Sequence, residues 1–108
     1  MKIEIYEAQY CDITTGKDCC KSILAVGGMP VKGPSYAYNS EEGKLKTIQK
    51  LMEWVFHNIN KIECTYTYME DLLKTIQMEK IYECNLDEKT VKEAIIDIKL
   101  KEIEQDFV

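Results

Sequence analysis

The side chains with the most reactive chemistry in this sequence are five cysteines and one histidine. Thiol catalysis needs a cysteine beside a general base, and Cys64 with His57 is the pair that could supply it. A single helical histidine more often packs or faces solvent, so we expect a structural role for His57. Cys11, Cys19 and Cys20 have no recognised zinc spacing, and one histidine does little to complete a tetrahedral site. The sequence therefore predicts no metal site, no cofactor and free thiols.

A glycine-rich stretch, GGMPVKGP at residues 27–34, stands before two tyrosines and a helix. Backbone amides of such a loop, a lysine and a helix N-terminus can together hold a phosphate. The spacing matches neither GxxxxGK[ST] nor GxGxxG, so a purely structural turn is the alternative. Tyrosines can stack on a planar ligand or anchor an interface, and ordinary strand tyrosines are the alternative. The predicted ligand-binding residues are Gly27, Gly28, Lys32, Gly33, Tyr36, Tyr38, Tyr66 and Tyr68.

Bulk composition limits the classes of protein to consider. A chain of 108 residues is expected to form one domain, 1–108, and 45% hydrophobic with 31% charged residues is typical of a folded protein. The net charge of −5 argues against nucleic acid as a partner, because backbone binding depends on many positive side chains. All 14 positive residues are lysine, so bidentate guanidinium contacts to phosphate are excluded within the chain.

Cysteine usage and hydropathy predict the compartment. Five cysteines without a CxxC pair favour free thiols in a reducing compartment over a disulfide framework. No apolar run approaches the roughly 18 residues of a membrane span, and the charged start MKIEIYE is not typical of a signal peptide. We therefore expect a cytoplasmic protein with no membrane partner.

The segment 40–60 is the clearest long amphipathic helix, and the other elements are expected to pack on it. Apolar residues recur three and four apart along one face. Ser40 or Asn39 can cap its start, where Glu41 and Glu42 suit the positive end of the helix. The predicted buried stripe is Leu45, Ile48, Met52, Val55 and Ile59.

Alternating and breaker patterns place the remaining elements around this helix. Strands are predicted at 2–11 and 19–26, paired as an antiparallel hairpin, and at 35–38. Residues 62–68 alternate and are expected to form a strand parallel to the first. A short helix at 69–77, a strand at 79–84 and a helix from 85 or 87 to 106 complete the chain. The predicted class is α+β with a mixed five-stranded sheet, in the order strand-strand-strand-helix-strand-helix-strand-helix.

That order resembles the ribonuclease H-like fold, whose members place a three-strand meander, a helix and then a strand parallel to the first. The segments IEIYEAQYC, NSEEGKL and CTYTYMEDL stand where nucleases of the family carry metal-binding carboxylates. Carried over, these positions fall on Ala8, on Glu42 or Gly43, and on Tyr66. The resemblance therefore implies the fold without intact two-metal catalysis.

A rearranged carboxylate site is the alternative that would restore nuclease activity. Glu7, Glu42 and either Glu70 or Asp71 could hold a divalent cation in a divergent metal-dependent nuclease. With 19 acidic residues in the chain, a solvated acidic surface accounts for the same residues. The prediction leans against an enzyme.

The last helix carries two apolar stripes, which suggests two buried contacts. Val91, Ala94, Ile95 and Ile98 form the first. The second is Ile96, Leu100, Ile103 and Phe107, which predicts a homodimer interface with a second copy. The alternative is that this helix curls over the sheet.

The hypothesis that follows is a non-catalytic binding protein. The chain is small and acidic, and its use of lysine without arginine fits an AT-rich coding sequence. These features suit a phage or mobile-element counter-defence factor. Such a factor would sequester a nucleotide-derived immune signal or occlude a host defence protein. The divergent nuclease and a dimeric structural subunit are the two alternatives.

Overall fold

The computed structural model describes the backbone of residues 1–106, with the side chains of residues 1–11 and 13–104. Five strands form one antiparallel sheet in the order β3-β2-β1-β5, and β4 also pairs with β2. The predicted α+β class with three helices is confirmed, whereas the predicted mixed sheet is wrong, because all of these strand pairings are antiparallel. The elements are β1 Lys2–Asp12, β2 Lys17–Val26, β3 Met29–Pro30, β4 Ala37–Tyr38, α1 Glu41–His57, α2 Met69–Thr75, β5 Met78–Asn85 and α3 Glu88–Asp106.

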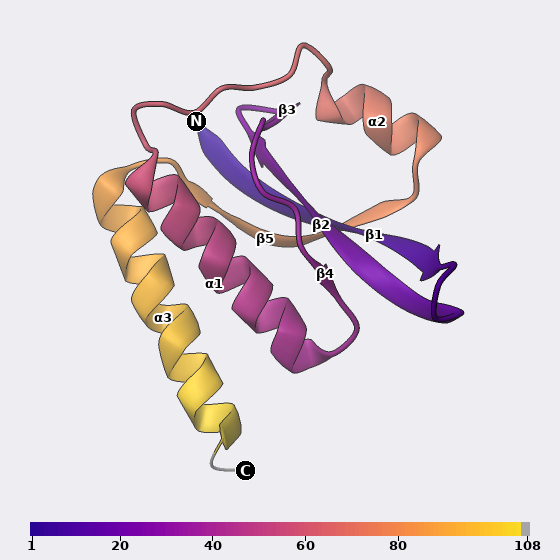
Figure 1. Ribbon diagram of the computed structural model, residues 1–108. Coiled ribbons are helices and arrows are strands. Elements are labelled where there is room, and N and C mark those ends of the chain that lie inside the picture. Colours follow the sequence, from indigo (N-terminus) through magenta and orange to yellow (C-terminus); the bar gives the residue numbers. More distant parts are fainter. Residues whose placement is uncertain (107–108) are drawn as a thin grey trace.

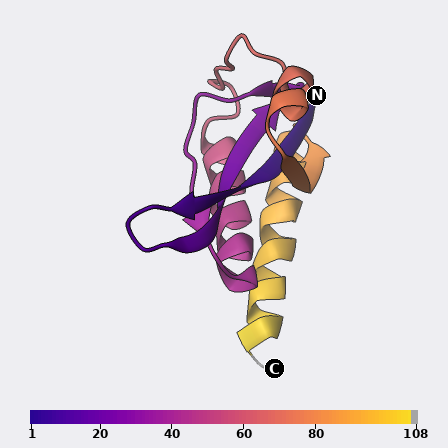
Figure 2. The same cartoon turned by 90° about the vertical axis from the view of Figure 1, so that its right-hand side faces the viewer.

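The β1–β2 hairpin is the longest pairing and fixes which side chains share a face. Its register runs from Ile3 opposite Val26 to Asp12 opposite Lys17. Because side chains alternate along a strand, Ile3 and Ile5 lie on one face and Tyr6 on the other. Figure 2 shows the far end of this hairpin extending away from the rest of the molecule. Half of the hairpin is therefore left without helical cover.

Helices cover the two faces of the sheet unequally. Figure 1 shows α1 and α3 side by side on one side of the strands and α2 on the other. The larger core lies under α1 and α3, and its buried members are Ile3, Ile5, Leu24, Val26, Ile48, Leu51, Met52, Val55, Val91, Ala94 and Ile98. The smaller core lies under α2 and consists of Tyr6, Ala25 and Met69.

Helix α1 begins and ends for local reasons. The backbone N–H of Gly43 donates to Ser40 Oγ over 3.0 Å, which confirms Ser40 as the N-cap. At the other end, Asn58 Nδ2 donates to the Trp54 carbonyl over 2.8 Å, so the helix stops three residues before the predicted end. The buried residues are Thr47, Ile48, Leu51, Met52 and Val55. Leu45 and Ile59 of the predicted stripe are only half-buried.

The predicted parallel strand at 62–68 is wrong. The first strand has two edges, and β2 and β5 occupy both, so no place beside β1 remains for a parallel neighbour. Residues 62–68 instead form a loop that touches the sheet at an isolated antiparallel bridge between Val31 and Cys64. Backbone bonds from Lys32 to Glu63 and from Thr65 to Pro30, each of 2.8 Å, hold it there. The order of elements therefore differs from the predicted one.

The glycine pair at 27–28 makes a tight turn between β2 and β3. Gly27 and Gly28 have φ angles of 61° and 82°, and they link Val26 to its register partner Met29. A two-residue hairpin turn with both φ angles positive is a position for which glycine is suited. The short strand β3 was not predicted, because the glycines and prolines of residues 27–34 indicated a loop.

None of the helices in the described part of the chain is long and apolar enough to cross a membrane. All five cysteines are free thiols, as predicted.

Candidate functional site

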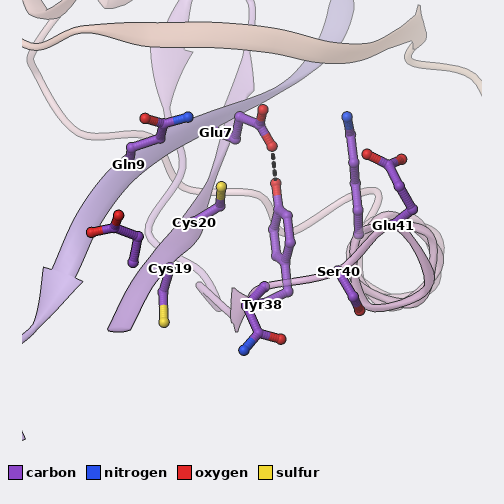
Figure 3. Close-up of a pocket in the computed structure, with 10 residues that line it drawn as sticks. Glu7, Gln9, Cys19, Cys20, Tyr38, Ser40 and Glu41 are labelled. Carbon is purple, nitrogen blue, oxygen red and sulfur yellow. Dashed lines mark hydrogen bonds between the residues drawn. The ribbon is translucent and has the colours of Figure 1, made fainter. Parts of the chain in front are cut away.

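A hollow in the described surface lies between the uncovered half of the hairpin and the start of α1 (Figure 3). Its volume is about 450 Å³. It is formed where the face of β1 that carries Ile3 and Ile5 changes to Glu7 and Gln9, beyond the reach of the helical core. The lining residues are Glu7, Gln9, Asp18, Cys19, Cys20, Tyr38, Asn39, Ser40, Glu41 and Lys44.

A hydrogen bond between Tyr38 and Glu7 forms the floor of this pocket. The Tyr38 hydroxyl donates to Glu7 Oε2 over 2.6 Å, and the tyrosine is only 9% exposed. Burial, followed by this bond to the carboxylate, raises the pKa of Tyr38 well above its usual range. The phenol is therefore a permanent donor at neutral pH, and it holds one oxygen of Glu7 in a fixed direction.

The segment before α1 is fixed to β2 by a serine, which positions Tyr38. Ser22 is fully buried, and its Oγ accepts from the backbone N–H of Tyr36 over 2.9 Å. Ser35 Oγ donates to the Ser22 carbonyl over 2.6 Å, and the Ser22 N–H donates to the Tyr36 carbonyl over 2.9 Å. Strand β4 then pairs Tyr38 with Cys20. These contacts connect the segment that carries Tyr38 to β2.

Cys20, one of the two cysteines that line the pocket, is a poor nucleophile. Burial, and then the nearby Glu7 carboxylate, raise the pKa of Cys20 above its usual value. A catalytic cysteine requires the opposite shift, because the thiolate is the reactive form. Figure 3 shows the Cys20 thiol directed toward Glu7 and the Cys19 thiol directed away from it. Cys20 therefore suits a place in the pocket wall better than a role as nucleophile.

The charge of the pocket is mainly negative. Glu7, Asp18 and Glu41 contribute carboxylates, and Lys44 contributes the one ammonium group among the lining residues. A neighbouring hollow of about 370 Å³ shares Glu7 and Gln9 and adds Glu79, the register partner of Glu7 on β5. The site therefore offers more acceptors and negative charge than donors and positive charge.

The predicted ligand-binding residues do not share one pocket. Of that set, Tyr38 alone lines the pocket described above. Gly27 and Gly28 form the β2–β3 turn, and a Cβ at Gly33 would lie 3.0 Å from the ring of Trp54. These glycines are explained by backbone geometry and close packing.

The other predicted side chains are spread along the molecule. Tyr36 packs against the larger core, with Lys50 Nζ 5.2 Å from its ring centroid. Tyr66 and Tyr68 are 96% and 60% exposed on the loop before α2, and Lys32 is exposed after β3. Tyr36 and Tyr38 both line a separate hollow of about 330 Å³ beside Lys46 and Lys50, but the glycine loop, Tyr66 and Tyr68 do not contribute to it.

The alternative carboxylate site is not assembled either. Glu42 pairs with Lys46 at 3.0 Å on the exposed side of α1. Glu70 and Asp71 belong to α2, on the opposite face of the sheet from Glu7. Among the side chains of residues 1–11 and 13–104, no three Asp, Glu, His or Cys residues gather as metal ligands.

Cys64 and His57, the pair considered for thiol catalysis, each contact other groups. Cys64 Sγ donates to the Val26 carbonyl over 3.7 Å, and the His57 ring packs against the edge of Phe56 with centroids 5.6 Å apart. Cys64 is therefore held against β2, whereas His57 is exposed at the end of α1.

Sequence reasoning named Glu7 and Tyr38 but not as partners, and it missed Asp18, Cys20 and Lys44. The available signal was the change from Ile3 and Ile5 to Glu7 and Gln9 at the same strand spacing.

Comparison of this chain with protein-family models, with curated proteins and with solved structures found no match in any of the three.

Proposed function

We propose that this protein is a non-catalytic binding protein that uses the pocket between the hairpin and α1. The observation that carries the proposal is the fixed Tyr38–Glu7 pair at the floor of an open polar hollow. Concave sites with a few oriented polar groups are typical of binding sites. Cys20 in the pocket wall has a raised pKa, which suits binding better than covalent chemistry.

The charges in the pocket favour a ligand group that is cationic or rich in hydrogen-bond donors. Three carboxylates line it, and Glu7 keeps one oxygen that Tyr38 does not occupy. A guanidinium or primary ammonium group would pair with these acceptors. The phosphates of a nucleotide would meet the same carboxylates with like charge, so a nucleotide-derived signal is a weaker match to this pocket.

Of the two binding roles suggested by the sequence, these charges favour occlusion of a partner protein. An arginine or lysine side chain on that partner would enter the pocket, while the exposed half of the hairpin would contact the surrounding surface. A counter-defence factor acting in the cytoplasm would work in this way against a basic surface of a host protein. The five free thiols fit such a reducing compartment.

Calorimetric titration with N-acetyl-arginine amide as the probe tests the proposal. AMP and cyclic AMP are the anionic comparison, and N-acetyl-leucine amide is the uncharged one. We expect saturable binding of the arginine probe alone. The double variant Asp18→Asn with Glu41→Gln should bind about tenfold more weakly, because it removes two charge-assisted acceptors.

The matched control is Glu70→Gln, which removes an exposed carboxylate on the opposite face of the sheet. It should bind the arginine probe as the unmodified protein does. Tighter binding of AMP than of the arginine probe, or equal losses in the control and the double variant, would overturn the proposal. Failure of every probe to bind would overturn it as well.

A further inference from the structure

Helix α3 carries an apolar seam on the side that faces away from its own core. Val91, Ala94 and Ile98 are buried against the sheet and α1. Of the predicted interface residues, Ile96, Leu100 and Ile103 are 58%, 53% and 50% exposed, and Phe107 lies outside the described residues. Their spacings of four and three residues match the a and d positions of a coiled coil. Both views show the last turns of α3 extending beyond the first turn of α1 (Figures 1 and 2).

Charged residues flank the seam in an ordered way. With Leu100 assigned to position a, Lys92 and Lys99 occupy g positions on one flank. Asp97 and Glu104 occupy e positions on the other flank. Each lysine thus stands five residues before an acid. In a parallel two-helix contact, a g residue meets the e residue five positions later in the partner helix.

The flanks distinguish parallel from antiparallel packing. A parallel pair brings Lys92 beside the second copy's Asp97 and Lys99 beside its Glu104. An antiparallel pair brings equivalent flanks together, so lysines would meet lysines and acids would meet acids. Like charges placed in this way oppose pairing.

We propose that two copies of this protein pair through α3 in parallel, about a two-fold axis that runs along the helices. Ile96, Leu100 and Ile103 form the seam, and the four charged residues form the reciprocal ion pairs at its borders. The two-fold axis makes each contact occur twice, as an isologous interface requires. This pairing does not depend on the binding function of the pocket.

Contacts within the chain already hold the two lysines on their flank. Lys99 Nζ lies 3.5 Å from Glu53 on α1, and Lys92 Nζ lies 5.4 Å from the ring centroid of Phe56. The side chain of Lys99 is still 53% exposed, so it can face an acid of the second copy as well as Glu53. The seam is short compared with stable interfaces, which bury about 1,200–2,000 Å² in total. We therefore expect reversible association that depends on concentration.

Sedimentation equilibrium from about 10 µM to about 1 mM tests the pairing. The unmodified protein should dimerise, and K92E/K99E should dimerise at least about tenfold more weakly, because every border contact becomes repulsive. The fourfold exchange K92E/K99E/D97K/E104K should restore dimerisation, because it recreates the parallel pairs with reversed signs.

The restoration is specific to parallel packing, since in an antiparallel pair the fourfold exchange would leave like charges facing each other. K101E, at an exposed position off the seam, is the matched control and should dimerise as the unmodified protein does. Circular dichroism checks that each variant is folded. A folded monomer at every concentration, or equal dimerisation by K92E/K99E and the unmodified protein, would overturn the proposal. Loss of dimer in K92E/K99E that the fourfold exchange does not restore would overturn the parallel arrangement.

Discussion

The Tyr38–Glu7 hydrogen bond links the floor of the pocket to the stability of the fold. Replacement by Tyr38→Phe keeps the buried ring and removes the hydroxyl that donates over 2.6 Å. We expect the free energy of unfolding to fall by about 1–3 kcal/mol, as for hydrogen bonds to charged groups. Urea denaturation measures this loss. Tyr68→Phe, at a residue 60% exposed, is the control and should change stability little. Equal stability of the two variants would contradict a structural role for the bond.

A second carboxylate makes stability depend on pH. Hydrogen bonds from Lys2 and then Lys80 lower the pKa of Glu83 from 4.5 to about 2. The stabilisation that comes from the charged form is therefore complete above pH 4.5 and is lost as pH falls from there toward 2. Glu83→Gln should lose less stability than the unmodified protein across this range. Urea midpoints measured at several pH values between these limits compare the two, and parallel curves would exclude this contribution.

At the scale of elements, the start of α1 depends on one side chain. Ser40 Oγ accepts from the Gly43 N–H, and Ser40 also lines the pocket. Ser40→Ala should lower the free energy of unfolding by about 1 kcal/mol, whereas Ser40→Asp should retain most of it, because aspartate is also a good N-cap. Chemical denaturation of both variants makes the comparison. If the aspartate variant is as unstable as the alanine variant, capping is not the cause.

Most elements were predictable because their signals are local. The alternation around Ile3 and Ile5 and the three-and-four spacing in α1 depend on residues within one segment. Residues 62–68 show the same alternation but form a loop. Their state was decided by β5, which occupies the second edge of β1 and comes later in the chain. The pattern within one segment cannot show that another strand pairs with the edge of β1 that this segment would need.

At the scale of the whole molecule, the site depends on how three segments meet. Glu7 comes from β1, Cys20 from β2 and Tyr38 from β4, and only the strand registers bring them together. The glycine loop had a stronger local signal, yet its glycines are explained by a turn and by packing against Trp54. Composition did indicate an acidic protein, and the pocket shares that acidity.

The uncovered half of the hairpin explains why a pocket exists at all. Two helices cover the apolar half of the sheet, and the polar half extends past them, next to the start of α1 (Figures 1 and 2). One face of β1 carries Ile3 and Ile5, which belong to the core. The same face then carries Glu7 and Gln9, which line the pocket. Substitutions in the core can therefore alter folding without changing a pocket residue, whereas Tyr38 and Ser40 contribute to both.

Mapping the position of a bound cation by NMR tests the central claim most directly. In a titration of ¹⁵N-labelled protein with N-acetyl-arginine amide, we expect saturable shifts of the backbone amides of Glu7, Cys20, Tyr38 and Lys44. The amides of Glu70 and Asp71, on the opposite face of the sheet, should not move. Saturable shifts confined to α2 or to the loop before it, with none at Glu7 or Tyr38, would contradict the account.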